Sequence, residues 1–382
     1  MKICYVSSEY PTNPPSRHGG IGTILQLLGR RLVAAGHHVI VVGQSSEAFE
    51  YDDQGVRVKY IKACPIPKLG AVVNLLRIRR MLRRMARRRD VDLIEATQSS
   101  AAFLPFDVDV PVIVRLHGGH RFVSANLGMK PRLVSDMFQH WYLKKAKTLV
   151  GVSRFVLERS IKLNRLHPIS THVIPNAVDA DLFCPDEKVT PEPDLIAFAG
   201  TLYRVKGIYQ LIDAMQLVLR ERPNAKLIMA GKDGGGPSNS VRAELVRRMS
   251  DELRQRVKFL GVVPHDELKE LYLRASVCVF PSLSESFGIV AIEAMSCGRP
   301  VVFTNLGPGP EVIEDGVSGF LCDPYDPRDI SSKVLQVLRD RELAESMGLN
   351  ARQRVLERFS ADVVVERNLQ FYEKCLDEHR SK

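Results

Sequence analysis

The stretch PSLSESFGIVAIEAM, residues 281–295, carries the strongest structural signal in this sequence. It follows Val277–Phe280, a short apolar run that predicts a buried strand. Ser286, Phe287 and Gly288 then open a helical pattern that contains Glu293. A strand that turns directly into a helix leaves free backbone amides at the start of the helix, where they can hydrogen-bond a hexose or a phosphate.

The same stretch contains two glutamates, Glu285 and Glu293, separated by eight positions. At about 1.5 Å per helical residue their backbones lie roughly 12 Å apart, whereas the paired carboxyls of glycoside hydrolases lie about 5–9.5 Å apart. The spacing therefore favours different hydroxyl partners, one carboxylate for a donor sugar and the other for a ribose diol. The alternative is structural, with Glu285 capping the helix and Glu293 in a salt bridge at the edge of the core.

Short apolar runs alternate with helical patterns along the whole chain. Runs typical of strands occur at residues 3–6, 39–42, 56–61, 112–116 and 148–152, and again at 196–199, 227–230, 277–280 and 301–303. Such runs between helices predict parallel sheets covered on both faces. Because 382 residues exceed what one core usually supports, the sequence predicts an α/β protein with two doubly wound, Rossmann-like domains.

The proline-rich, charged residues 184–194 separate the two series of strands and predict a linker. We expect a first domain over residues 1–183, a second over residues 195–360, and a final helix within residues 361–382. Ligands of doubly wound sheets bind beyond the carboxyl ends of the strands. The binding site is therefore expected in a cleft where the two domains face each other.

Three further motifs follow predicted strands. Gly19 and Gly20 precede a predicted helix. They either allow backbone amides to approach a diphosphate or are needed only for the tight turn between strand and helix. His117 ends the run at residues 112–116 beside two glycines, and a lone histidine there is either a ligand contact or structural. Residues 199–207, AGTLYRVKG, place Lys206 at the start of a helix, where it suits a diphosphate leaving group.

This ordered set of motifs resembles glycosyltransferase family 4, a retaining family with the GT-B fold, whose signature is a pair of glutamates separated by seven residues. Further stretches are similar to the family in the same order: VSR at 152–154, PNAVD at 175–179, LG at 260–261 and EVIEDG at 311–316. The resemblance covers nearly the whole chain. It implies two domains that face each other across a cleft and a last helix, residues 361–382, that crosses back to the first domain, which binds the acceptor.

Carried over by position, the resemblance implies three catalytic residues, His117, Lys206 and Glu285. It assigns the diphosphate to Gly20 and Lys206, the donor sugar to His117 and Glu285, and the ribose to Glu293. The full donor-binding set is Gly19, Gly20, Thr201, Arg204, Lys206, Glu285, Phe287, Gly288, Ile289 and Glu293. Many family members have arginine where this chain has Thr201, so a diphosphate contact is in question. Arg204 either replaces that charge or is a solvated surface residue.

No cofactor and no metal site are expected, because amides, helix dipoles and Lys206 can stabilise the leaving diphosphate. The seven cysteines are scattered and form no C-x-x-C pair, which indicates reduced thiols. No apolar run is long enough to span a bilayer, and the first residues do not form a signal peptide. We therefore expect a cytoplasmic protein, with the inner face of the membrane as a possible peripheral location.

Positive charge is concentrated in the first half of the chain. Residues 1–183 contain 27 Lys and Arg against 14 Asp and Glu, whereas residues 184–382 contain 27 against 30. Residues 75–89 predict a basic helix in which Leu75, Ile78, Leu82 and Met85 form an apolar stripe. The helix either docks on anionic lipid or faces the core with a solvated arginine face. Nucleic acid is not an expected partner, since no aromatic or fold-level feature supports it.

The predicted function is transfer of a hexose, with retention, from a nucleoside-diphosphate sugar to a glycan, lipid-linked or small-molecule acceptor. A UDP-sugar is favoured and a GDP-sugar is next, and cell-surface polysaccharide or glycoconjugate biosynthesis is the expected setting. Two alternatives stay open: a sugar-nucleotide epimerase on the same fold, and a non-catalytic sugar-nucleotide-binding partner subunit. An epimerase would need no acceptor.

Overall fold

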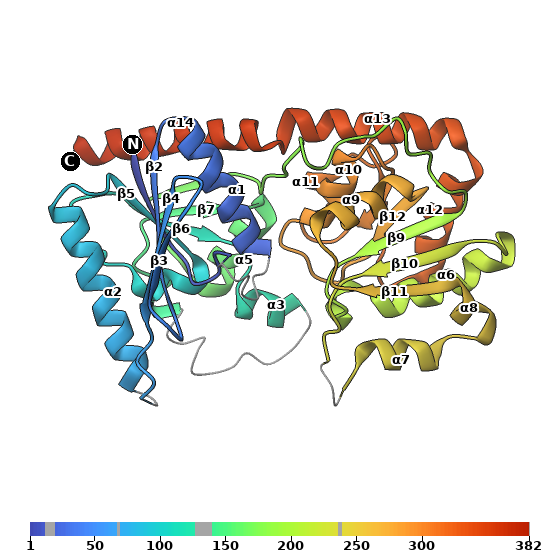
Figure 1. The fold of residues 1–382 in the computed structure, drawn as a ribbon, viewed down its shortest axis with the longest axis horizontal. Coiled ribbons are helices and arrows are strands. Elements are labelled where there is room, and N and C mark those ends of the chain that lie inside the picture. The colour runs from blue at the N-terminus through green and yellow to red at the C-terminus, as the bar shows by residue number, and fades with distance from the viewer. Residues whose placement is uncertain (12–19, 67–68, 127–139, 236–238, 382) are drawn as a thin grey trace. The chain divides into compact units, whose positions relative to one another are not determined.

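The computed structural model describes residues 1–11, 20–66, 69–126, 140–235 and 239–381 (Figure 1). They form two compact units, of which the first comprises residues 1–177 with 361–382 and the second residues 178–360. In the part of the chain described, no helix combines the length and the apolar character needed to cross a membrane.

The first unit contains an eight-stranded sheet in the order β3-β4-β2-β1-β5-β6-β7-β8. Its strands are β1 Lys2–Val6, β2 His38–Ser45, β3 Phe49–Asp53, β4 Val56–Lys62, β5 Leu93–Thr97, β6 Val112–Leu116, β7 Thr148–Gly151 and β8 Ser170–Val173. All neighbours pair in parallel except β3 and β4, which are antiparallel. The helical elements are α1 Gly20–Ala34, α2 Leu69–Arg87, η1 Gln98–Phe103, α3 His120–Asn126, α5 Arg154–Asn164 and α14 Ala361–Arg380.

The second unit contains a six-stranded, wholly parallel sheet in the order β11-β10-β9-β12-β13-β14. Its strands are β9 Leu195–Ala199, β10 Lys226–Ala230, β11 Val257–Gly261, β12 Val277–Phe280, β13 Val301–Thr304 and β14 Phe320–Cys322. Its helical elements are η2 Arg204–Lys206, α6 Ile208–Glu221, α7 Val241–Arg248, α8 Asp251–Arg256, α9 His265–Arg274, α10 Ile289–Ser296, α11 Gly309–Val312, α12 Pro327–Arg339 and α13 Arg341–Arg358. The predicted α/β class with two Rossmann-like units is confirmed.

The division between the units falls after Ala177, earlier than the boundary predicted after residue 183. The Val178 amide donates to the Phe359 carbonyl oxygen at 2.9 Å, and the Arg352 guanidinium donates to the Ala180 carbonyl oxygen at 3.1 Å. The residues predicted as a linker are also tied to the second unit, since the Glu192 amide donates to the Arg274 carbonyl oxygen at 2.8 Å. These contacts join residues that are distant in the sequence and determine the domain boundary. The local composition around residue 177 does not predict them.

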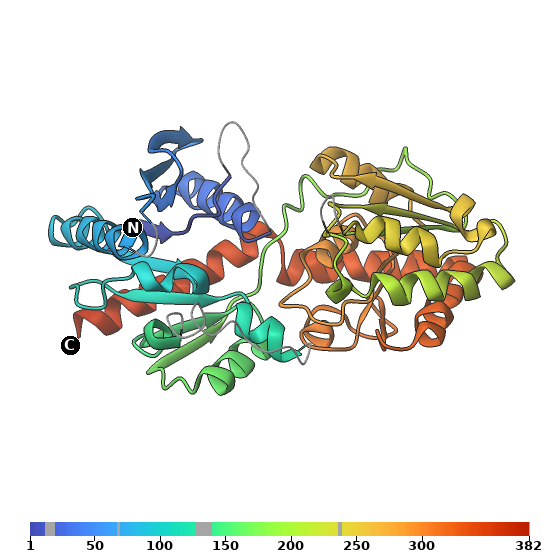
Figure 2. The same cartoon turned by 90° about the horizontal axis from the view of Figure 1, so that it is seen from below.

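The last helix, α14, packs on the first unit and contributes to its buried polar network (Figure 2). Glu95 on β5 and Arg115 on β6 form a buried ion pair, with Nε to Oε1 at 2.6 Å. From α14, the Tyr372 hydroxyl donates to Glu95 at 2.9 Å and the Asn368 side-chain oxygen accepts from Arg115 at 2.5 Å. Removing either partner would strand a buried charge, which typically costs about 3–5 kcal/mol, so this network fixes α14 on the sheet.

Candidate functional site

The second unit brings Lys206 and Glu285 together because two neighbouring strands end side by side. Strands β9 and β12 pair in parallel, so their carboxyl ends lie at the same edge of the sheet. The segment after β9 contains η2, and the Leu283 amide in the loop after β12 donates to the Val205 carbonyl oxygen at 2.8 Å. This contact between the loops leaves the Lys206 ammonium 2.6 Å from Glu285 Oε2.

Glu285 is held as a carboxylate by its surroundings. Burial alone would raise its pKa. The Lys206 ammonium and the hydrogen bonds from the Ser286 amide and the Ser282 hydroxyl lower it, and their combined effect is larger, so the pKa lies below its ordinary value. The Lys206 side chain is 28% exposed and the Glu285 side chain is 13% exposed. The pair is therefore charged and still reachable by a ligand.

Two glycines allow the close approach of these loops. Gly207 has a φ of 67°, and a Cβ there would lie 1.7 Å from the Pro281 carbonyl oxygen. Gly288 has a φ of 102°, and a Cβ there would lie 2.4 Å from the Phe303 ring. Both positions need glycine for conformation and for space. Gly207 lets the segment with Lys206 approach the loop after β12, and Gly288 lets the start of α10 pack against Phe303 on β13.

The start of α10 presents unused hydrogen-bond donors. Among the described residues, the amides of Phe287, Gly288, Ile289 and Val290 have no hydrogen-bond acceptor. The Phe287 side chain is buried and packs edge-on against Phe359, so only its backbone is available to a ligand. Free amides at a helix start, together with the helix dipole, form a site for an anion or a hydroxyl-rich ligand.

Glu293 lies in a different environment from Glu285. It is buried on α10, and its Oε2 accepts a hydrogen bond from the Tyr272 hydroxyl on α9 at 3.1 Å. Burial raises its pKa to about 7, although the Tyr272 hydrogen bond works in the opposite direction. The predicted ribose contact stays a prediction, and the predicted salt bridge at the core edge is not what the structure shows, since the partner is a neutral phenol.

Thr201 and Arg204 follow β9 but differ in their surroundings. Arg204 is largely exposed, stacks over the Tyr209 ring at 4.7 Å and lies 3.7 Å from Glu244. Its charge is thus directed to these two residues rather than to the Lys206–Glu285 pair. Thr201 is half-buried, and its carbonyl oxygen accepts from the Tyr203 amide at 2.7 Å. Their contribution to a diphosphate site stays a prediction.

The remaining predicted residues belong to the first unit. His117 directly follows β6, and its Nε2 atom is buried without a hydrogen-bond partner among the described residues. Burial, with a smaller effect from the Arg115 charge, lowers its pKa to about 3. Gly20 is the first residue of α1, and Gly19 lies outside the described residues. His117 is therefore neutral at physiological pH, so it can hydrogen-bond a hydroxyl group.

Three Asp-x-Asp triplets occur in the sequence, at residues 90–92, 107–109 and 179–181, and each has structural contacts. Asp92 accepts from the Lys2 amide at 2.7 Å, and Asp107 pairs with Arg83 at 3.0 Å. Asp179 accepts from the Leu182 amide at 3.2 Å. These carboxylates thus support local structure.

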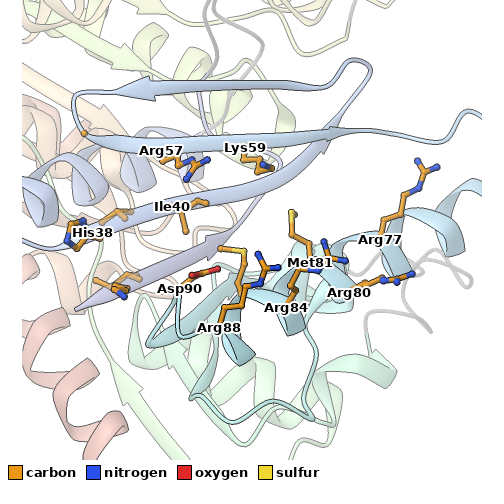
Figure 3. Close-up of a pocket in the computed structure, with 15 residues that line it drawn as sticks. His38, Ile40, Arg57, Lys59, Arg77, Arg80, Met81, Arg84, Arg88 and Asp90 are labelled. Carbon is orange, nitrogen blue, oxygen red and sulfur yellow. The ribbon is translucent and has the colours of Figure 1, made fainter.

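A cationic groove lies in the first unit (Figure 3). It has a volume of about 840 Å³ and runs between α2 and strands β1, β2 and β4, and Asp90 also lines it. Lys2, His38 and Arg57 line it near the amino ends of their strands, whereas His117 lies at a carboxyl end. Arg77, Arg80, Arg84 and Arg88 line the other side.

The apolar stripe predicted on this helix belongs to the core. Ile78 and Leu82 are fully buried, whereas Leu75 and Met85 are half-buried. The core-facing interpretation therefore holds for Ile78 and Leu82, whose side chains are not available to lipid.

Two partners of the site escaped the sequence analysis. The Ser282 hydroxyl donates to Glu285, three positions later in the chain. Short polar side chains often make such local hydrogen bonds in turns, so this contact could have been predicted from the motif. Tyr272 contacts Glu293 from a separate helix, and a sequence offers no signal for such a pair.

Comparison with known proteins identifies the family of the chain. Residues 18–182 match the model "Glycosyltransferase Family 4", and residues 184–354 match "Glycosyl transferases group 1". The chain belongs to the family 4 glycosyltransferases with the GT-B fold. The predicted family and fold are thereby confirmed.

Individual relatives agree with this assignment. An uncharacterized glycosyltransferase of Methanocaldococcus jannaschii is 29% identical over 99% of each chain. Among solved structures, sucrose-phosphate synthase from Thermosynechococcus elongatus has a TM-score of 0.83 at 24% identity, covering 99% of this chain and 100% of that one. Anabaena HepE, solved with UDP and glucose, has a TM-score of 0.79 at 20% identity, covering 98% of this chain and 100% of HepE.

Proposed function

We propose that this glycosyltransferase moves a hexose from a UDP-sugar to a glycan or lipid-linked acceptor, with retention of configuration and without a metal ion. The observation that carries the proposal is the Lys206–Glu285 pair, 2.6 Å apart, next to the free amides at the start of α10. This arrangement combines a cation for a leaving diphosphate, amide donors for oxygens and a carboxylate for sugar hydroxyls.

The positive charge needed by the leaving group comes from the protein itself in this proposal. As the bond between the anomeric carbon and the diphosphate oxygen lengthens, negative charge grows on the diphosphate. The Lys206 ammonium and the α10 amides stabilise that charge without reorganisation, which is where preorganised groups contribute most to a rate. Glu285, held ionised beside Lys206, accepts hydrogen bonds from donor hydroxyls.

Retention follows in this proposal from attack on the face that the diphosphate leaves. The acceptor oxygen forms the new bond to an oxocarbenium-like anomeric carbon, and its proton passes to an oxygen of the departing β-phosphate. No protein nucleophile is then required. Neutral His117 contributes a hydrogen bond to a sugar hydroxyl and does not take up the proton, because its pKa is about 3.

The choice of UDP is supported by HepE, which has been solved with UDP and with UDP-glucose. A glycan or lipid-linked acceptor belongs to the same proposal, because the mechanism needs a hydroxyl group that attacks the anomeric carbon. Synthesis of a cell-surface polysaccharide or glycoconjugate is the setting that we propose for this reaction.

Thermal-shift titration with UDP-, GDP-, ADP- and dTDP-sugars in excess EDTA tests the donor and the metal together. A ligand present at about 100 times its dissociation constant stabilises the protein by about 2.7 kcal/mol. We expect a selective shift with a UDP-sugar that EDTA does not reduce, and a smaller shift in Lys206→Ala. A shift that appears only after Mg²⁺ is added would contradict metal independence, and a shift selective for another nucleotide would contradict UDP.

Product analysis then separates transfer from epimerisation. We expect sugar to remain on the nucleotide until an acceptor is supplied, and the anomeric configuration of the product, read by NMR, to match that of the donor. A changed sugar on the intact nucleotide in the absence of acceptor would contradict the proposal.

A further inference from the structure

Helix α2 carries an exposed stripe that the transfer reaction does not use. Successive outward positions along the helix are Leu69, Val72, Leu76, Arg80, Arg84 and Arg87, and all six are exposed. Their spacing of three or four residues places them on one line along the helix. We call these six residues the outer stripe. It is aliphatic over the first two turns and consists of arginine over the last three.

The aliphatic half of the outer stripe is unusual for a protein surface. Leu69, Val72 and Leu76 are 51–59% exposed, and Ile66 immediately before the helix is 54% exposed. Single exposed aliphatic residues need no explanation, but a contiguous group indicates a contact surface. Figure 1 shows that the first turns of α2 lie at the rim of the first unit.

This aliphatic group is held in place by the fold. The Cys64 amide donates to the Asn74 side chain at 2.8 Å, and the Gly70 amide donates to the Ile66 carbonyl oxygen at 2.7 Å. A Cβ on Gly70 would lie 2.3 Å from the Cys64 carbonyl oxygen, so a glycine is needed there for the chain to pack onto the helix. These contacts fix Cys64 and Ile66 against the first turns of α2.

The arginines of α2 divide into two groups. On the inner flank, Arg79 donates to the Ala102 carbonyl oxygen at 2.8 Å and Arg83 pairs with Asp107 at 3.0 Å. In the described part of the chain, Arg80, Arg84 and Arg87 make no ion pair or hydrogen bond, and the helix contains no acidic residue. Arg80 and Arg84 also line the cationic groove (Figure 3). These cations are available to an external anion.

We propose that the outer stripe docks this enzyme on an anionic lipid bilayer. Leu69, Val72 and Leu76 enter the boundary between headgroups and acyl chains, and Arg80, Arg84 and Arg87 bind lipid phosphates. The two halves extend roughly 10 Å each along the helix axis at 1.5 Å per residue. The aliphatic half enters first, so the helix lies oblique to the surface.

Charge disfavours the competing occupants. A second copy docked through the same stripe would bring arginine against arginine if the two helices ran parallel, and arginine against aliphatic residues if they ran antiparallel. Neither arrangement pairs the arginines, because α2 contains no acidic residue. A free acidic glycan would satisfy the arginines but would leave the four aliphatic residues in water. An anionic bilayer satisfies both halves.

Vesicle flotation of the full chain, without donor or acceptor, tests this inference independently of the proposed reaction. We expect binding to vesicles that contain phosphatidylglycerol and little binding to vesicles of phosphatidylcholine alone. The triple variant Arg80→Gln/Arg84→Gln/Arg87→Gln should bind about a hundredfold more weakly, since each cation near an acidic surface contributes about 1 kcal/mol. The variant Leu69→Ser/Val72→Ser/Leu76→Ser should bind at least about tenfold more weakly.

Matched controls use exposed residues of the second unit. Arg220→Gln/Arg247→Gln/Arg328→Gln removes the same charge, and Val262→Ser/Leu349→Ser removes exposed aliphatic residues. Both should bind acidic vesicles like the wild type, and all variants should melt like the wild type. Binding that survives either triple variant of α2 would overturn the proposal. A dimer in solution that the Leu69→Ser/Val72→Ser/Leu76→Ser variant disperses would instead assign the stripe to a second copy.

Discussion

Glu285 and Glu293 lie in one short stretch of sequence but in opposite electrostatic environments. Glu285 is on a loop beside the Lys206 ammonium, which lowers its pKa despite burial. Glu293 is on the helix that follows, where it accepts a hydrogen bond from the Tyr272 phenol, and burial raises its pKa to about 7. The difference shows that a nearby cation, rather than burial alone, determines which carboxylate is ionised. The predictions below test that conclusion.

The largest effect is expected from Lys206→Ala. Loss of the ammonium removes both the counterion of Glu285 and the proposed stabiliser of the leaving diphosphate, so turnover should fall about 10²–10³-fold, as when one preorganised donor is lost. Steady-state kinetics measures the change, and circular dichroism checks that the fold is kept. Turnover within a few-fold of the wild type would show that Lys206 is only the partner of Glu285.

Glu293→Gln is expected to change the pH dependence of stability. In the unfolded chain the carboxyl loses its proton near its ordinary pKa of 4.5, whereas in the fold it keeps it to about pH 7. The contribution of the Glu293 carboxyl to the free energy of unfolding is therefore fully present below pH 4.5 and is lost as pH rises through 7. The total is on the order of 3 kcal/mol.

Denaturant unfolding of the unliganded protein at pH 4.5 and pH 8 measures this loss. The Gln variant should lose less stability than the wild type between the two values. Equal losses in the two proteins would mean that Glu293 is ionised in the fold, like Glu285.

His117→Gln extends the comparison to a desolvated base. The folded pKa of His117 is about 3 and its ordinary value is 6.5, so the unfolded chain takes up a proton first as pH falls. Stability linked to this histidine is complete above pH 6.5 and decreases below it, by about 2 kcal/mol at pH 5. Melting curves at pH 7.5 and pH 5 should therefore shift less in the variant. A parallel shift in both proteins would contradict a neutral His117.

The smallest effect is expected from Arg204→Ala, the matched control for Lys206→Ala. Arg204 is exposed and stacks on Tyr209 beside Glu244, and surface ion pairs contribute about 0–1 kcal/mol. Turnover and donor affinity should change by about twofold at most. A loss comparable to that of Lys206→Ala would show that Arg204 supplies the charge that Thr201 does not.

The sequence predicts much of this fold because its central strands are short apolar runs. Strands β6 and β12 match the predicted ranges residue for residue. Strand β5 was missed because Glu95 interrupts its apolar pattern, and only the fold provides Arg115 and Tyr372 to neutralise it. The acidic edge strand β3, FEYDD, likewise lacks a local signal.

The candidate site was predictable where it depends on order along the chain. Strand, glycine turn and helix predict where Lys206 and Glu285 lie relative to their own strands. Their 2.6 Å contact also requires that β9 and β12 be neighbours, although β10 and β11 separate them in the sequence. The lowered pKa of Glu285 depends on Lys206, and the raised pKa of Glu293 depends on its burial in the fold, so neither shift can be read from the motif itself.

The anchoring of α14 by Tyr372 and Asn368 has a consequence for biosynthesis. The first unit takes its strands from residues 1–177 and its last helix from residues 361–382. At roughly 5–20 residues per second, a ribosome needs on the order of ten to forty seconds to synthesise the intervening segment. During that time Glu95 and Arg115 have no α14 to cover them. The first unit therefore reaches its final packing only after the whole second unit has been synthesised.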